Sequence, residues 1–204
     1  MADLGQDGRL VLLLDDFEAI GGNERYIDFL ERFRGLTNHV RMTLIAATHT
    51  ELRFCCHMSS VESPFSNMFS VQYLSTCTEE EALELISTAS EAYGVDLLPY
   101  AGEMLALSGR MPYLLQLVCW RFHQAALIRE SPDHQDVEAF MLAKAGPMLA
   151  RIWHSLDTRE RETLRAQSHG PSPNEIEENL VRRGYSDGSG ICSTVLATYV
   201  ATMS

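Results

Sequence analysis

The sequence contains very little lysine and no basic segment. Its 204 residues carry 16 Lys and Arg against 28 Asp and Glu, for a formal net charge of −12, and Lys144 is the single lysine. The net charge is −4 over residues 1–76, −6 over 77–152 and −2 over 153–204. A surface that binds duplex DNA has to neutralise several phosphates. The charge distribution therefore argues against DNA as a partner.

Long hydrophobic runs, a signal sequence and paired cysteines are also missing. The longest apolar runs are five or six residues, far short of the ~20 that a membrane-spanning helix needs, and no basic region followed by an apolar stretch opens the chain. The five cysteines are an odd number without a C-x-x-C pair, which favours reduced thiols over disulfides or a metal site. Apolar residues still make up 46%, enough for a packed core. We expect a cytoplasmic protein without a membrane partner.

The first third of the sequence predicts a strand, a helix and a second strand. Continuous apolar runs cover residues 10–14 and 42–48 and are typical of strands buried on both faces of a parallel sheet. Between them, apolar residues recur at helical spacing over 26–33, with Asn23 as a candidate cap and Gly35 at the end. Such a βαβ unit binds ligands at the carboxyl ends of its strands. The sequence therefore predicts an α/β core with parallel strands.

Polar residues follow both predicted strands. Asp15 and Asp16 close the first strand, and Thr48 lies at the end of the second. On one interpretation, the two acids are only polar residues where the chain returns to water. On the other, one carboxylate holds the Mg²⁺ shell and its neighbour orients an attacking water, as phosphoryl transfer requires. The strand ends alone leave both interpretations open.

These segments resemble a known family. Residues 11–18, VLLLDDFE, resemble the Walker B strand of the STAND class of P-loop ATPases, which are relatives of the AAA+ proteins. Residues 44–52 resemble the sensor strand that follows it, and residues 63–69 resemble a short segment that precedes the helical lid in bacterial STAND-like ATPases. The resemblance implies ATP and Mg²⁺ as cofactors and a P-loop NTPase type of core.

The resemblance also implies roles for individual residues. Asp15 would help to hold magnesium, Asp16 would be the catalytic acid, and Thr48 would sense the γ-phosphate. His49 stands beside this sensor position, where many relatives have Arg. The change from Arg to His implies weaker sensing of the phosphate.

The loop that would grip the nucleotide is absent from the sequence. A Walker A loop needs G-x-x-x-x-G-K-[ST], because backbone N–H groups cradle the phosphates and the Lys reaches the terminal ones. Lys144 follows Ala143 in a helical stretch, so this chain has no such loop. The abrupt start at Met1, a few residues before a core strand, favours a chain that begins after the loop. We therefore expect no ATP hydrolysis by this chain alone, and we expect the missing P-loop portion or another protein domain as its partner.

The middle of the sequence predicts a helical lid. Residues 69–74 alternate and suggest a short strand, and Thr78 with the acids at 79–81 forms a capping box for a helix that ends at Gly94. A second helix is predicted over 99–108, and Pro112 opens a long amphipathic third one.

The turn between the last two lid helices resembles a motif of the same family. Read alone, Gly109-Arg110-Met111-Pro112 is only a turn. Beside the Walker B match it resembles the Gly-x-Pro lid motif, whose proline lies against the adenine base in related ATPases. The resemblance implies Pro112 as a base contact and Arg110 as a phosphate contact.

The last quarter predicts a winged-helix domain. Gly146-Pro147 is expected to interrupt the preceding helix, and capping boxes at 157–160 and 172–175 each start a new one. Residues 186–190 suit the tip of a small hairpin, with a closing helix after it. The helix at the recognition position, 174–183, carries Glu175, Glu177 and Glu178 and is basic only in its last turn, which argues against DNA reading. The resemblance to STAND proteins implies instead a regulatory winged helix packed on the ATPase core.

The sequence as a whole predicts three parts: the end of a P-loop ATPase core over 1–76, a helical lid over 77–150 and a winged-helix domain over 151–204. A regulatory ATPase switch is the first hypothesis, and the full-length protein could form a homo-oligomer. The alternatives are a nucleotide-independent scaffold for protein contacts and a winged-helix DNA regulator.

Overall fold

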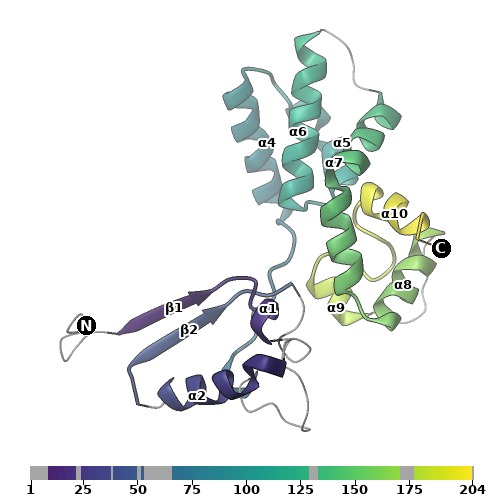
Figure 1. Cartoon of the computed structure of the whole chain (residues 1–204). Coiled ribbons are helices and arrows are strands. Elements are labelled where there is room, and N and C mark those ends of the chain that lie inside the picture. Colours follow the sequence, from purple (N-terminus) through teal and green to yellow (C-terminus); the bar gives the residue numbers. More distant parts are fainter. Residues whose placement is uncertain are drawn as a thin grey trace. The chain divides into compact units, whose positions relative to one another are not determined.

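The computed structural model divides into two compact units, Met1–Gln72 and Tyr73–Ser204. The first contains two parallel strands and the second is almost entirely helical (Figure 1). The structure describes residues 9–21, 24–37, 39–49, 52, 66–128, 133–170 and 177–203. The expected cap Asn23 and residues 63–65 lie outside these ranges, as do Thr50 and Glu51 of the expected sensor segment.

A βαβ arrangement forms the first unit, as the sequence predicts. Strand β1 (Leu10–Leu14) pairs in parallel with β2 (Met42–Ala46), in a register that sets Leu14 opposite Ala46. The connection contains α1 (Glu18–Gly21), the 3₁₀ turn η1 (Glu24–Tyr26) and α2 (Ile27–Thr37), and a second 3₁₀ turn, η2 (Ser66–Met68), comes later. Helix α2 therefore ends two residues beyond the predicted Gly35.

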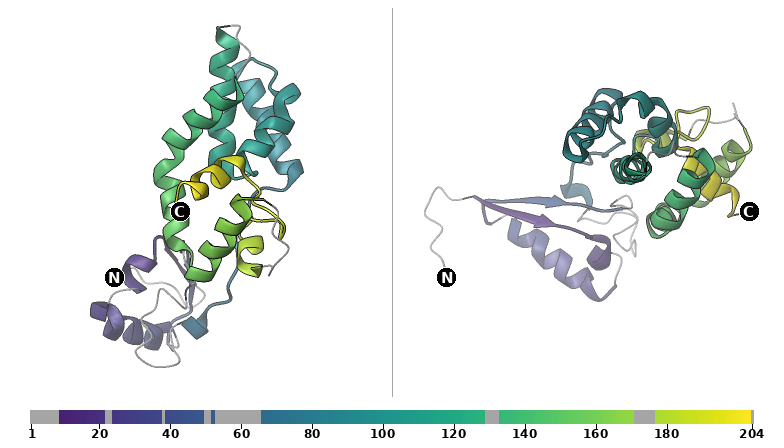
Figure 2. Two further views of the ribbon diagram at one scale, coloured as in Figure 1. Left: turned by 90° about the vertical axis from the view of Figure 1, so that its right-hand side faces the viewer. Right: turned by 90° about the horizontal axis from the view of Figure 1, so that it is seen from above.

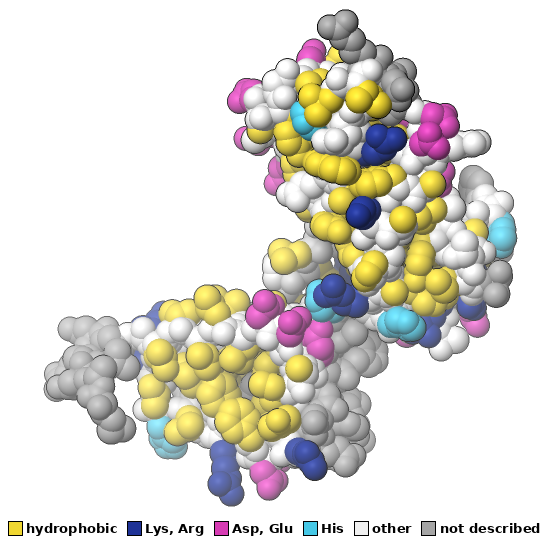
Figure 3. Space-filling view, turned by 45° about the horizontal axis from the view of Figure 1, so that its top comes forward, with side chains coloured by type: hydrophobic (Ala, Val, Ile, Leu, Met, Phe, Trp, Pro, Cys, Tyr) yellow, Lys and Arg dark blue, Asp and Glu magenta, His cyan; other side chains and the backbone are white. Residues whose placement is uncertain are grey.

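Only one face of this sheet is covered by the described residues. Phe17, Leu30 and Leu52 are buried and pack with residues of both strands, and α2 lies behind the strands in the right-hand view of Figure 2. On the other face, the side chains of Leu13 and Ile45 are 70% and 55% exposed. Hydrophobic side chains are correspondingly visible over this unit in Figure 3. The prediction of burial on both faces is therefore wrong for this structure, because one layer of helix covers the sheet.

The second unit is a set of helices around one continuous apolar core. The helices are α4 (Glu79–Tyr93), η3 (Leu98–Tyr100), α5 (Ala101–Ser108), α6 (Pro112–Leu127), α7 (His134–Ser155), α8 (Thr158–Ser168), α9 (Glu178–Arg182) and α10 (Thr194–Ala201). Fully buried side chains from most of them belong to the same cluster, with Leu115 on α6 and Leu196 on α10 among its members. The predicted lid and the C-terminal helices therefore share a core.

Two predicted capping boxes start helices of this unit. The Glu81 N–H donates to Thr78 Oγ1 at 3.2 Å, and the Thr78 N–H donates to Glu81 Oε2 at 2.8 Å. The Thr78 backbone N–H, and after it the Thr78 hydroxyl, which also donates to Glu81 Oε2 at 3.0 Å, lower the pKa of Glu81. Asp157 and Glu160 make the same reciprocal pair at the start of α8, both at 2.8 Å. Both boxes are confirmed.

Two local predictions for this half of the chain are wrong. Residues 69–74 form no strand. Helix α7 runs without a break through Gly146 and Pro147, since Pro147 lies on its exposed side, where water can satisfy the backbone carbonyl that loses its N–H partner. Buried Ala145 and Leu149, on either side of the proline, hold the same face of the helix in the core.

The C-terminal helices follow the predicted order without establishing a winged helix. The predicted box at 172–175 lies outside the described residues, and α9 begins at Glu178. Ser186 and Ile191 form an antiparallel bridge at the predicted hairpin. The tip is stabilised by Asp187, whose carboxylate accepts hydrogen bonds from Ser189 and Gly190 that lower its pKa. The winged-helix assignment and the division at residues 76 and 150 stay predictions.

Candidate metal and nucleotide site

The ends of the two strands are tied together by backbone hydrogen bonds. The Ala47 N–H donates to the Leu14 carbonyl at 2.8 Å, and the Phe17 N–H donates to the Ala47 carbonyl at 3.1 Å. Between these bonds Asp16 has a φ of 47°, in the left-handed region that Asp tolerates better than most residues. Phe17 is buried, so it anchors the turn and leaves Asp16 exposed and Glu18 half-buried on either side of it.

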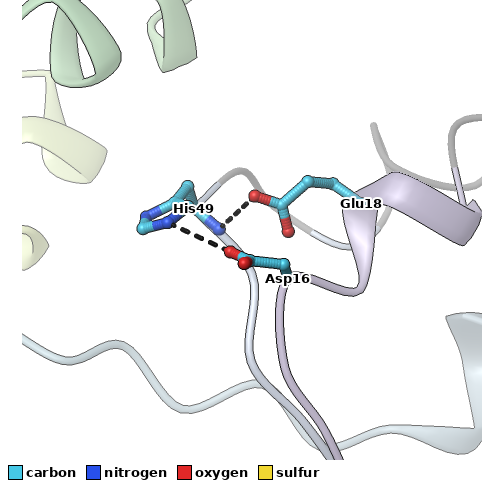
Figure 4. A group of neighbouring side chains, drawn as sticks. All are labelled: Asp16, Glu18 and His49. Atoms are coloured by element: carbon cyan, nitrogen blue, oxygen red, sulfur yellow. Dashed lines mark hydrogen bonds and ion pairs between the residues drawn. The ribbon is translucent and has the colours of Figure 1, made fainter. Parts of the chain in front are cut away.

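Three potential metal ligands come together at this turn. Asp16, Glu18 at the start of α1, and His49 after β2 each offer one ligand atom, and these atoms lie within 4.8 Å of one another (Figure 4). His49 Nε2 is 3.5 Å from Asp16 Oδ1, and the His49 backbone N–H donates to Glu18 Oε1 at 3.3 Å. Within the described parts of the chain this is the one such group of three His, Cys, Asp or Glu residues.

The second carboxylate oxygen of Glu18 lacks a partner. Glu18 Oε2 is enclosed and accepts no hydrogen bond from the described residues. A buried acceptor without a partner is costly, and a bound cation would satisfy it. With the carboxylate of Asp16 nearby, the oxygen donors of this group fit a divalent ion.

The sequence points to two of these three residues, with roles other than metal binding: Asp16 is predicted as the catalytic acid and His49 as a neighbour of the phosphate sensor, whereas the predicted metal ligand is Asp15. Glu18 is part of the Walker B-like segment without a predicted role of its own. The signal is its position two residues after Asp16 with an apolar residue between them, because both acids then lie beside the turn when Phe17 is buried. The left-handed turn at Asp16, which sequence reasoning does not reveal, then brings both acids close to the second strand.

Asp15 and Thr48 lie beside this group. Asp15 Oδ1 accepts the backbone N–H of Asp16 at 3.0 Å, so its carboxylate caps the turn. Thr48 lies between Ala47, which carries the tie to β1, and His49. The roles predicted for Asp15 in metal binding and for Thr48 in phosphate sensing stay predictions.

The other two predicted site residues, Arg110 and Pro112, are in the second unit, in the turn between α5 and α6. Gly109 and Arg110 both have positive φ, 58° and 60°. Arg110 is fixed through its backbone, since its N–H donates to Ser108 Oγ and its carbonyl accepts the Cys77 N–H. Pro112 is the first residue of α6 and is exposed, as a residue that contacts a ligand needs to be.

The same turn packs directly against the start of α10. A Cβ added to Gly109 would lie 2.7 Å from Ser193 Cβ and 2.9 Å from the Cys192 carbonyl carbon. Ser193 caps α10 by accepting the Leu196 N–H, and its hydroxyl donates to the Leu107 carbonyl at 2.7 Å. The predicted lid motif is therefore fixed to the C-terminal helices at a position where only glycine fits.

Comparison with known proteins identifies the family. The family model for novel STAND NTPase 2 matches residues 5–145, which is more than half of the chain and includes both strands, the strand-end residues and the lid turn. The chain therefore belongs to the STAND NTPases, and this membership implies nucleotide binding in general. No curated protein and no solved structure matches it. None of the helices that the structure describes is long and apolar enough to cross a membrane.

Proposed function

We propose that this chain is the acid-strand, lid and C-terminal part of a regulatory nucleotide switch of the STAND type. ATP with Mg²⁺ would use the strand-end residues for its metal and phosphates, and the turn at Pro112 for its base. The bound nucleotide would then control how the C-terminal helices pack, as a winged-helix module in a cytoplasmic signalling protein. Asp16 is the catalytic acid in this proposal, with Asp15, Thr48 and His49 beside it.

One observation carries the proposal: the family match covers both strand ends, and the structure gathers acidic and imidazole groups at that place. Phosphoryl transfer needs mainly positioning and charge stabilisation, and a rigid strand end can supply both. The backbone bonds from Ala47 to Leu14 and from Phe17 to Ala47 support such rigidity.

The contact between Gly109 and Ser193 supports the switching part of the proposal. A ligand that shifts the turn at Pro112 would also move Gly109, which touches the cap of α10 without free space between them. Close-packed contacts of this kind transmit small displacements because packed cores do not deform continuously. The bound nucleotide would in this way affect the packing of the C-terminal helices.

The chain would need a partner to complete the nucleotide site. Its 204 residues contain no G-x-x-x-x-G-K-[ST], so the phosphate cradle must come from elsewhere. Leu13 and Ile45 leave one face of a parallel sheet exposed, although such sheets are normally covered on both faces. We assign this face to the P-loop portion of the same protein or to another protein domain that carries the loop.

The native protein and its gene test this proposal. We expect a Walker A loop in a strand-loop-helix setting within ~100 residues upstream of the first strand. We also expect 8-azido-ATP to label the peptide that contains Pro112 in the native protein, and excess ATP to prevent the labelling. If the upstream sequence has no such loop and the peptide is not labelled, the chain is a nucleotide-independent scaffold instead.

A further inference from the structure

The group formed by Asp16, Glu18 and His49 differs from a plain cluster of acids in its chemistry. Two carboxylates and one imidazole meet at one place, contributed by two strand ends and the first residue of α1 (Figure 4). Mg²⁺ takes oxygen ligands and retains several waters, whereas imidazole suits first-row transition metals. Two carboxylates with one imidazole are donors that Mn²⁺ accepts readily.

The ligands are held in position before any ion binds. The His49 N–H bonded to Glu18 Oε1 orients that carboxylate and leaves Oε2 enclosed without a hydrogen bond. Asp15 fixes the Asp16 backbone through its own carboxylate. The side chains of His49 and Asp16 are 56% and 74% exposed, so an ion from solvent can reach both.

We propose that Asp16, Glu18 and His49 bind a divalent transition-metal ion such as Mn²⁺ directly and without nucleotide. Asp16 and Glu18 supply carboxylate oxygens, His49 supplies Nε2, and water completes the coordination. This site goes beyond the magnesium role of the proposed switch, because it gives a ligand function to Glu18 and to an imidazole. Metal binding at this site does not require a P-loop, so it can be tested independently of the proposed function.

Titration with Mn²⁺ followed by electron paramagnetic resonance of the free ion tests the site on this chain. We expect one Mn²⁺ per chain, bound at least about tenfold more weakly after Glu18→Gln or His49→Ala. Asp28→Asn and His39→Ala are the matched controls, since both residues are exposed, belong to the same unit and lie outside the group. We expect both controls to bind Mn²⁺ within about twofold of the unmodified chain.

Electron spin-echo modulation of the bound Mn²⁺ detects the imidazole itself. We expect a directly coordinated histidine nitrogen in the unmodified chain and its loss in His49→Asn, which serves as a second variant if His49→Ala does not fold. In a competition titration, Mg²⁺ should bind the site at least about tenfold more weakly than Mn²⁺ does. Absence of Mn²⁺ binding, or binding that is equal in all variants, would overturn the proposal. Binding that depends on Glu18 and not on His49 would overturn it as well, because carboxylates alone would then hold the ion.

Discussion

The two compact units differ in how completely their apolar residues are covered. In the second unit, buried side chains from α4 through α10 form one cluster, and most of the largest are fully enclosed. In the first, the buried residues of the described part are Phe17, Leu30 and Leu52, and one face of the sheet is open. The candidate metal ligands belong to the first unit. The helical unit therefore encloses its own core, whereas the strand-end site is carried by a sheet with one exposed face.

Truncation of one leucine in each unit should show the largest difference between them. Leu115 is completely buried, and Leu115→Ala should lower the free energy of unfolding by about 3 to 4 kcal/mol because it leaves a cavity. Leu13 is mostly exposed, and Leu13→Ala should change the free energy of unfolding by less than about 0.5 kcal/mol. Urea denaturation measures both, and a loss of equal size for Leu13→Ala would show that its face of the sheet is covered in this chain.

A pair of glycines tests the contact at the lid turn. Gly109 and Gly94 have similar positive φ, 58° and 66°, but a Cβ on Gly109 would meet Ser193 and Cys192, whereas nothing lies within 4 Å of one on Gly94. We expect Gly109→Ala to cost about 2 to 3 kcal/mol and Gly94→Ala about 1 kcal/mol, the latter from backbone strain alone. Thermal unfolding checks both. Equal losses of stability in the two variants would mean that the start of α10 moves to accommodate the added methyl group without loss of stability.

The reactivity of the Cys119 thiol measures how completely the helical core excludes solvent. Burial raises its pKa to about 11 from an ordinary 9.0. At pH 8 the folded protein should therefore react with a thiol reagent about 100-fold more slowly at Cys119 than a free cysteine does. Because the raised pKa belongs to the folded state, the stability that it contributes is complete below pH 9 and is lost as the pH rises toward 11.

This experiment uses a chain in which the other four cysteines are replaced by serine, with urea added as the control. Fast modification in urea and slow modification without it would support a closed core. Fast modification in both conditions would contradict it.

The smallest expected effect concerns the capping box of α4. Hydrogen bonds from Thr78 lower the pKa of Glu81, so the ionised carboxylate stabilises the folded state above its ordinary pKa of 4.5. This stability is lost as the pH falls through the lowered pKa of the folded state. Glu81→Gln should therefore lower the unfolding midpoint slightly at pH 7 and not at pH 2. A difference that persists at pH 2 would mean that the charge of Glu81 plays no part.

Structural features that depend on residues close together in the sequence, such as strands and helix starts, are predicted well. The two strands follow from continuous apolar runs, and the starts of α4 and α8 follow from Thr78 and Asp157 with the Glu three residues later. Pro147 shows the limit of such local rules: a proline on the exposed side of a long helix does not break it when Ala145 and Leu149 hold the other face in the core.

The parts of the site that could not be predicted depend on contacts between distant segments. An apolar run does not say which elements cover each face of a strand, so the exposure of Leu13 and Ile45 was not foreseen. The position of Glu18 depends on the left-handed turn at Asp16 and on a hydrogen bond from His49, 31 residues away. The packing of Gly109 against Ser193 likewise depends on tertiary structure, which no spacing in the sequence reveals.

We propose that this chain carries the acid side of an ATPase site without the loop that grips the nucleotide. ATP hydrolysis by the chain alone, with Mg²⁺ present, tests it most directly, with Asp16→Asn as the comparison. We expect both proteins to release phosphate no faster than buffer that contains ATP and Mg²⁺. Magnesium-dependent turnover that Asp16→Asn abolishes would show instead that this chain hydrolyses ATP without such a loop.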